Sequence, residues 1–241
     1  MTIRHLAIAA TALCIVTVAP AQAFLIDNFA TTQSVSRTGV GSNGAGIATA
    51  GAVGGTRYTE ATVTSGAGTL DLSSNTPIPS AFSHSQGSGV TGSSLLQWDG
   101  DTNSTLDFGL GGVDLTDMGI STGIVIRLIS TDFPVNITLT VYENASDFSS
   151  RTVTLPALAM NIDFFVDFAS FIATGAGADF TSVEAITLTM NDTPPTFANA
   201  DLTIDFIESA PPPNVSEAGT LALFGLGLIG VAVARRRNAK A

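Results

Sequence analysis

The chain has 241 residues, of which 20 are acidic and 9 are basic, with 24 glycines and a single cysteine. Five of the nine bases lie close to the chain ends, so residues 24–217 hold four arginines against all 20 acids, a net charge of −16. A body this acidic repels phosphate backbones, which excludes nucleic acid as a partner. About 190 residues suffice for one substantial core, and we therefore expect a single domain.

The first 23 residues have the three parts of a secretory signal peptide. A basic dipeptide precedes the apolar run 6–19, and an Ala-x-Ala sequence at Ala21 and Ala23 follows it. This order predicts a signal helix that signal peptidase removes by cutting after Ala23. The alternatives are a retained membrane anchor and a lipoprotein signal, but Leu13 stands before Cys14 where a lipoprotein has small residues. Because Cys14 is lost with the signal, the mature protein forms no disulfide.

Residues 24–208 show the period of two that is typical of half-buried strands. Alternation of apolar and polar residues is clear in four segments, 59–64, 135–142, 185–190 and 201–207. Nearly continuous apolar runs at 123–129 and 162–166 indicate strands nearer the centre of a sheet. About ten to twelve candidate strands without an amphipathic helix predict an all-β fold, a two-sheet antiparallel β-sandwich that is jelly-roll-like.

Glycine marks the turns between these strands. The pairs Gly54-Gly55 and Gly111-Gly112 indicate backbone with positive φ, which glycine adopts without a steric penalty. Residues 38–55 are rich in glycine, alanine and serine, and they predict either a glycine-rich strand pair or a loop.

The body has few residues suited to catalysis. Its only histidine is His84, in a polar stretch, and no Gly-x-Ser-x-Gly elbow accompanies it. One histidine without cysteine cannot fill the usual zinc ligand set. Paired carboxylates, as in glycosidases, remain an alternative, although aromatic side chains to stack sugars beside them are lacking. We interpret His84 as an ordinary strand or loop residue and the protein as not an enzyme.

One acidic turn has the spacing of a calcium loop. Asp99, Asp101 and Asn103 alternate, and Asp107 adds a further carboxylate. A hard cation needs several oxygens from one tight turn, so these four residues are candidate calcium ligands, and no other cofactor is indicated. The alternative is a polar hairpin turn whose side chains bond their own backbone. The neighbouring Trp98 is interpreted as a core residue, with a sugar-binding platform as the alternative.

The C-terminal end predicts a membrane segment. The proline-containing spacer and motif occupy 209–217, an uncharged stretch follows at 218–234, and the basic tail 235–241 begins with Arg235, Arg236 and Arg237. As a helix, 218–234 is about 25 Å long, at the short limit for a transmembrane span. The basic cluster predicts a cytoplasmic tail and an external body. The alternative, a buried core helix, does not explain that cluster.

The order of these terminal features resembles a known sorting signal. The motif residues are Val215, Ser216, Glu217, Ala218, Gly219 and Thr220, followed by the apolar stretch and the three arginines. They resemble the PEP-CTERM signal of Gram-negative bacteria, in which a Pro-Glu-Pro motif precedes a membrane helix and an arginine cluster, and an exosortase cuts there. Ser216 and Ala218 replace the two prolines of that motif, whereas Glu217 is present.

This resemblance implies the destination of the protein and some of its partners. It implies an exosortase substrate that is anchored transiently in the inner membrane and then reaches the cell surface or the extracellular space. The body, through 25–29, 54–57 and 98–100, also resembles the β-sandwich bodies that accompany this signal. We therefore expect an exported, non-catalytic cell-surface or extracellular-matrix protein. The alternatives are a carbohydrate-binding module associated with exopolysaccharide and a hydrolase.

Overall fold

The computed structural model describes residues 23–157, 160–192 and 196–212, which contain fourteen strands and two short 3₁₀ helices. The predicted signal peptide, membrane segment and basic tail lie outside the described residues, apart from Ala23. Within the described part, no helix has the length and apolar character needed to span a membrane. In chain order the elements are β1 (Phe24–Asp27), β2 (Gln33–Thr38), β3 (Gly41–Ala48), η1 (Val53–Gly55), β4 (Thr56–Ser65), β5 (Thr69–Ser74), β6 (Phe82–Gln86), β7 (Thr91–Trp98), β8 (Gly123–Thr131), β9 (Val135–Tyr142), β10 (Phe148–Leu155), β11 (Met160–Asp167), η2 (Phe168–Ser170), β12 (Ile172–Thr174), β13 (Ala185–Met190) and β14 (Asp201–Ala210).

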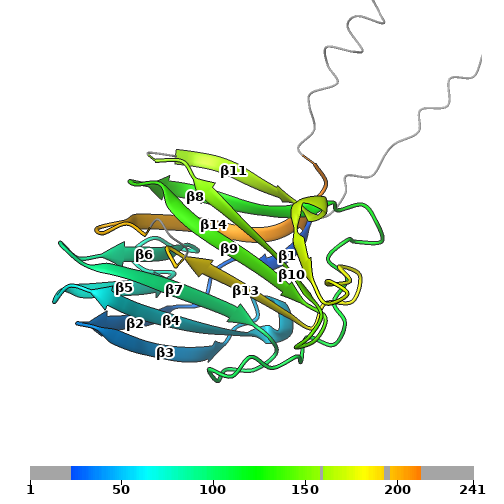
Figure 1. Ribbon diagram of the computed structural model, residues 1–241, viewed down its shortest axis with the longest axis horizontal. Helices are drawn as coiled ribbons and strands as arrows, with labels where there is room; N and C mark the ends of the chain where they lie inside the picture. Colours follow the sequence, from blue (N-terminus) through cyan, green and yellow to red (C-terminus); the bar gives the residue numbers. More distant parts are fainter. Residues whose placement is uncertain (1–22, 158–159, 193–195, 213–241) are drawn as a thin grey trace, which may run out of the picture.

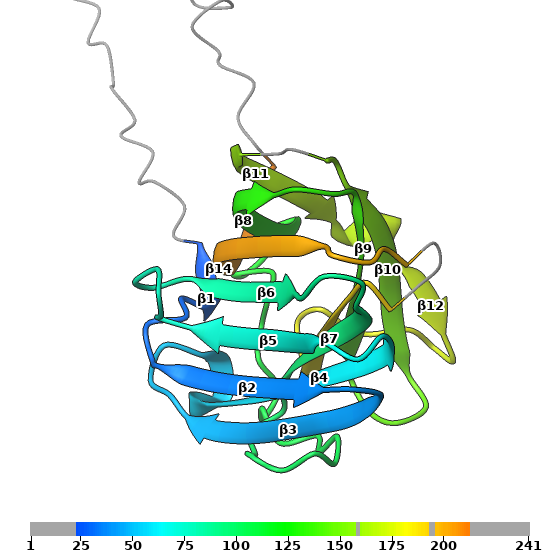
Figure 2. The same cartoon turned by 90° about the vertical axis from the view of Figure 1, so that its left-hand side faces the viewer.

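The strands form two antiparallel sheets of seven strands each. Sheet A has the order β11-β8-β14-β6-β5-β2, and β1 also pairs with β14. Sheet B has the order β12-β10-β9-β13-β7-β4-β3. Figure 1 shows the two layers, and in Figure 2 the strands β14, β6, β5 and β2 of sheet A lie toward the viewer. The predicted all-β, two-sheet antiparallel sandwich is therefore confirmed.

The chain alternates between the sheets in the second half of the body. Four strands run β6-β14-β8-β11 in sheet A, and four run β7-β13-β9-β10 in sheet B. The connections from β6 to β7, β7 to β8, β8 to β9, β10 to β11 and β13 to β14 all cross from one sheet to the other. This is the strand order of a jelly roll, which β5-β2 extends on one sheet and β4-β3 on the other.

The core lies between the sheets and follows directly from the period of two. On β9, Ile137, Leu139 and Val141 are fully buried, as are Ile186 and Leu188 on β13. Alternate residues of these strands point to the outer face. The segments predicted from alternation, 135–142 and 185–190, coincide with β9 and β13, because each buried apolar side chain contributes about 1.5–3 kcal/mol and so fixes the register.

The glycine-rich segment forms a strand rather than a loop. β3 pairs along its whole length with β4 at the edge of sheet B, beside β2 at the edge of sheet A. Side chains link the two edges: Gln33 Nε2 donates to the Ala45 carbonyl at 2.7 Å, and Asn43 Nδ2 donates to the Ser36 carbonyl at 2.9 Å. These bonds satisfy carbonyl groups that an open edge would present to another chain.

The body begins and ends at neighbouring positions. Phe24 of β1 pairs with Ser209 of β14. β14 continues to Ala210, which pairs with Gly123, so the strand runs two residues beyond the predicted domain end at 208. Both sheets and the buried core lie within residues 24–210, which are therefore one folding unit.

Candidate functional site

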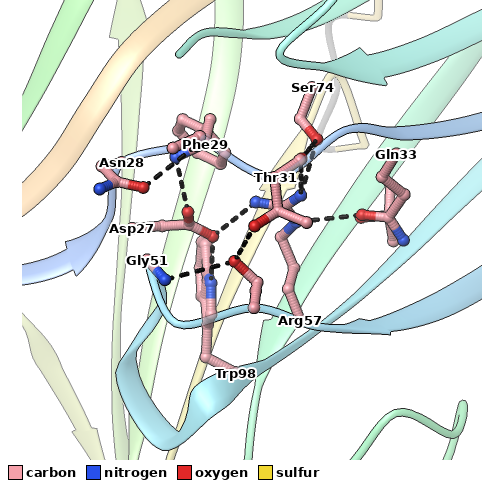
Figure 3. A network of polar contacts seen from close by, with 12 residues as sticks. Asp27, Asn28, Phe29, Thr31, Gln33, Gly51, Arg57, Ser74 and Trp98 are labelled. Carbon is pink, nitrogen blue, oxygen red and sulfur yellow. Dashed lines mark hydrogen bonds and ion pairs between the residues drawn. The ribbon is translucent and has the colours of Figure 1, made fainter.

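A buried ion pair lies at the centre of a polar network in the interior. Arg57 on β4 and Asp27 at the end of β1 have no exposed side-chain surface, and Arg57 Nη1 lies 2.8 Å from Asp27 Oδ2. The indole Nε1 of Trp98 donates to the same carboxylate oxygen at 2.8 Å, and the Phe29 amide donates to Oδ1 at 2.8 Å. The Asp27 carboxylate is thus bonded at both oxygens (Figure 3).

The rest of the Arg57 guanidinium is also bonded. Nε donates to Gln33 Oε1 at 3.1 Å, and Nη2 donates to Ser74 Oγ at 2.7 Å. The guanidinium carbon lies 5.2 Å from the centroid of the Phe29 ring, within the range of a cation–π contact. These contacts join β1, β2, β4 and β5, and Trp98 adds β7, so the network ties the two sheets together.

Burial governs the electrostatics of this pair. Burial raises the pKa of the Asp27 carboxyl above its usual 3.8, while Arg57, Trp98 and the Phe29 amide act in the opposite direction. A buried pair with complete hydrogen bonding contributes little net stability compared with apolar residues, but removing one partner is costly. Asp27, Arg57 and Trp98 are fully buried, and Gln33 and Ser74 are 8% and 1% exposed.

The network brings together segments 25–29, 54–57 and 98–100, through which the body resembles the β-sandwich bodies that accompany the sorting signal. Asp27 lies in segment 25–29, Arg57 in 54–57 and Trp98 in 98–100, far apart in the chain. Their contacts were not predicted. The available signal was the presence of one arginine and the only tryptophan beside short glycine-containing motifs. The prediction that Trp98 is a core residue is confirmed, since its side chain is 0% exposed.

His84 belongs to a second buried network. It lies on β6, is 1% exposed, and its Nδ1 is 2.8 Å from Ser94 Oγ on β7. Gln86 Nε2 donates to His84 Nε2 at 3.0 Å, which assigns the ring proton to Nδ1. Burial lowers the pKa of His84 to about 4. The imidazole is therefore neutral at pH 7, and the residue lies on a strand, one of the two places that the sequence predicted for it.

The candidate calcium ligands lie in the turn after β7. Asp99 is fully buried, and its carboxylate accepts hydrogen bonds from Gln97 Nε2 at 2.7 Å and from the amides of Asp101 at 3.1 Å and Asp107 at 2.8 Å. Asp101 accepts the Thr102 amide, and Asn103 Nδ2 donates to Asp107 Oδ2 at 3.1 Å. Among the described residues, no three acidic or histidine side chains converge to hold a metal ion. The oxygens thus bond mainly within the turn, and calcium binding stays a prediction.

A hollow of about 670 Å³ opens where the chain leaves the body. Its wall includes Asp114, Ser121, Phe168 and Pro212, the last described residue. Hydrogen bonding from the Thr116 hydroxyl lowers the pKa of the Asp114 carboxyl. The Ser121 hydroxyl is buried and has no hydrogen-bond partner among the described residues. The hollow is mostly apolar, and none of the described residues that line it is basic.

The predicted processing residues fall at the limits of the structure. Ala23 is exposed immediately before β1, and Ala21 lies outside the described residues. The motif residues 215–220 and the arginines 235–237 lie outside them as well.

The class of protein follows from the sandwich and the sequence beyond its last strand. Residues 214–237 match the PEP-CTERM protein-sorting motif. The chain is a β-sandwich body carrying this motif at its C-terminal end, and the motif implies an exported protein that an exosortase processes and sorts to the cell surface. No curated protein matches the chain.

Several solved structures resemble the body at low identity. A family 11 carbohydrate-binding module from Clostridium thermocellum, in complex with a β-1,3-1,4-mixed-linked tetrasaccharide, is 9% identical with a TM-score of 0.40, over 80% of this chain and 98% of that one. The solution structure of CtCBM11 is 10% identical with a TM-score of 0.42, over 82% and 100%. An exo-β-agarase is 11% identical with a TM-score of 0.38, over 82% of this chain and 24% of that one. At these TM-scores the likeness carries no conclusion about ligand or activity.

Proposed function

We propose that the protein is a non-catalytic component of the cell surface or extracellular matrix, held transiently in the inner membrane by residues 218–234. An exosortase then cuts near Glu217 and releases or transfers the body. The observation that carries this proposal is the sorting motif at 214–237, which begins four residues after β14 ends.

The geometry of the chain ends supports a body attached at one side. Phe24, the first residue after the predicted signal peptidase cut, pairs with Ser209, and β14 ends one residue later at Ala210. From the sequence, the prolines at 211–213 are expected to act as a stiff spacer, since proline-rich chain favours an extended conformation. The rest of the sandwich is then free to extend away from the membrane.

The burial of the candidate catalytic groups supports a non-catalytic body. His84 is enclosed between the sheets and hydrogen-bonded to Ser94 and Gln86, so it has no access to a substrate. The buried carboxylates Asp27 and Asp99 are each bonded to three or more donors. A general acid or base needs a substrate within hydrogen-bond reach.

Mass spectrometry of the mature C-terminus tests the processing step. We expect the surface form to end near Glu217 and to lack peptides from residues 221–234. The variant Glu217→Gln should slow the cut, because it removes the one charge of the motif. Glu208→Gln, on β14 outside the motif, is the matched control. Recovery of peptides 221–234 from the fully mature surface form contradicts the proposal.

The alternative function, a carbohydrate-binding module associated with exopolysaccharide, is favoured by one specific observation, the registered serine and threonine rows on β10, β9 and β13 of sheet B.

A further inference from the structure

The two sheets differ sharply in charge. Seven acidic residues lie on the strands of sheet A, and Asp201, Asp205 and Glu208 all lie on β14. On the seven strands of sheet B, Glu60 is the only acidic residue. In a body of net charge −16, the strands of this sheet thus carry little negative charge, although the loop that reaches it through Thr105 adds Asp101 and Asp107. Long-range repulsion acts on anions near the whole molecule, so an anionic polymer is disfavoured as the occupant of this face.

Hydroxyl groups cover the middle of that face in registered rows. One row across β10, β9 and β13 consists of Thr152, Thr138 and Thr189, and the next consists of Ser150, Thr140 and Thr187. Their strands also carry the buried core residues, so these alternate residues lie on the outer side of the sheet, although Thr140 and Thr187 of the second row are only 8% and 7% exposed. Neighbouring strands are about 4.8 Å apart, which sets the spacing within a row. We call these six residues the hydroxyl face.

The hydroxyl face offers both donors and acceptors. Thr138 Oγ1 and Thr152 Oγ1 are 2.8 Å apart, which shows that hydroxyls of neighbouring strands lie within hydrogen-bond reach. Thr152 is exposed and Thr189 is partly exposed, so the first row is accessible to solvent. Each hydroxyl has one donor and two acceptor positions, and a partner with many hydroxyls can therefore bond along the row.

Aromatic rings lie at one end of the face. Tyr142 continues the outward positions of β9, and its ring centroid is 5.3 Å from that of Phe148 and 6.1 Å from that of Phe108. Phe108 is 36% exposed and belongs to the loop that reaches sheet B where Gln97 Nε2 donates to the Thr105 carbonyl at 2.9 Å. This loop stands beside the second hydroxyl row, in which Thr187 pairs with Gln97. The C–H faces of sugar rings pack on such rings.

We propose that the hydroxyl face, with Phe108 and Tyr142 at its end, binds an uncharged polysaccharide chain. Sugar hydroxyls bond to the accessible first row, Thr152, Thr138 and Thr189, and one sugar ring packs against the exposed aromatic edge. A protein partner is disfavoured, because protein interfaces have an apolar, aromatic-rich centre and this face has hydroxyls there. The inference rests on the proposed function, since export brings the face into contact with polymers outside the cell.

Affinity electrophoresis in gels containing soluble polysaccharide tests the proposal. The probes are a neutral glucan, a neutral galactomannan and the polyanion alginate, each run with the full chain in mild detergent and with residues 24–210. We expect at least one neutral polymer to retard the protein and alginate to have no effect. The double variant Thr152→Val/Thr189→Val should weaken the retardation at least fivefold, because valine keeps the shape and removes the hydroxyls.

The matched control is Thr203→Val, on the outer face of sheet A, which should bind like the unchanged protein. Thermal melting of all variants checks that they fold. The proposal is overturned if neither neutral polymer retards the protein, if alginate does, or if the double variant binds unchanged. Sedimentation showing a dimer that the double variant abolishes would also overturn it, in favour of a second copy. None of these outcomes alters the mature C-terminus, so the proposed processing stands or falls separately.

Discussion

Arg57 carries a buried positive charge that is stable only because its partners are buried with it. Replacing it by methionine leaves the Asp27 carboxylate bonded to Trp98 and Phe29 but without a cation. We expect Arg57→Met to lower the free energy of unfolding by about 3–5 kcal/mol, the usual cost of removing one member of a buried pair. Urea unfolding followed by Trp98 fluorescence measures it.

An exposed ion pair of the same type provides the control. Arg127 Nη1 lies 2.7 Å from Asp163 Oδ1, but these side chains are 36% and 51% exposed. Solvent screens such a pair, so Arg127→Met should change stability by less than about 1 kcal/mol. Equal losses in the two variants would show that burial of the Arg57 pair is not what makes it important.

His84 should make the protein less stable in mild acid. Its folded-state pKa of about 4 lies below the usual 6.5, so between these values the unfolded chain binds the proton and the folded chain does not. The contribution of His84 to stability is therefore complete above pH 6.5 and is lost as the pH falls toward 4, by about 2 kcal/mol at pH 5.

The variant His84→Gln isolates this effect. It removes the titrating group and keeps a polar side chain that can bond to Ser94. Every other ionisable group is common to both proteins, including Asp27, whose raised pKa acts in the opposite direction. The difference between stability at pH 7 and at pH 5 should thus be about 2 kcal/mol smaller in the variant. The same loss in both proteins would mean that other groups cause it.

At the scale of elements, the turn from Asp99 to Asp107 is expected to hold its shape without a cation. Asp99 already accepts three hydrogen bonds from Gln97, Asp101 and Asp107. Asp99→Asn replaces one acceptor by a donor that faces other donors, and should cost about 1–3 kcal/mol, whereas exposed Asp101→Asn should have little effect.

Melting with chelator and with millimolar calcium decides between the turn and the calcium loop. We expect equal melting temperatures. A bound ion would instead add about 2.7 kcal/mol at a hundred times its dissociation constant. In that case Asp101→Asn should also reduce the gain, and the four-residue calcium prediction would be established.

Local pattern decided which elements could be predicted from the sequence. The strands β9 and β13 follow from alternation, because each apolar residue there faces one common core. β3 has almost no apolar side chains and is a strand only because β4 pairs with it. Burial of His84 depends on Ser94, which the fold brings from the opposite sheet. The contact of Asp27 with Arg57 and Trp98 depends in the same way on residues distant in sequence, which no local pattern specifies.

At the scale of the whole molecule, the two sides of the sandwich differ in how their strand edges are protected. On one side the edges of β2 and β3 are linked by Gln33 and Asn43. On the other side β11 is the edge of sheet A, and among the described strands only the three-residue β12 covers β10 at the edge of sheet B. Open edges favour pairing with another copy, and the large negative charge opposes it by repulsion.

Acid should remove this protection and reveal the open side. Carboxylates begin to protonate toward pH 4, and 1 M salt shortens the Debye length to about 3 Å. We expect residues 24–210 to stay dispersed at pH 7 and low salt and to associate as the pH approaches 4, as light scattering would record.

Met160→Lys, at the exposed start of the open edge strand β11, should reduce that association more than Val40→Lys in the β2–β3 turn, because only β11 lies on the open side. The two variants are matched, since each adds one charge at a side chain that is 69% or 64% exposed. Equal effects would mean that net charge alone controls solubility, and a flat trace down to pH 4 would mean that the negative charge serves another purpose, such as binding cations.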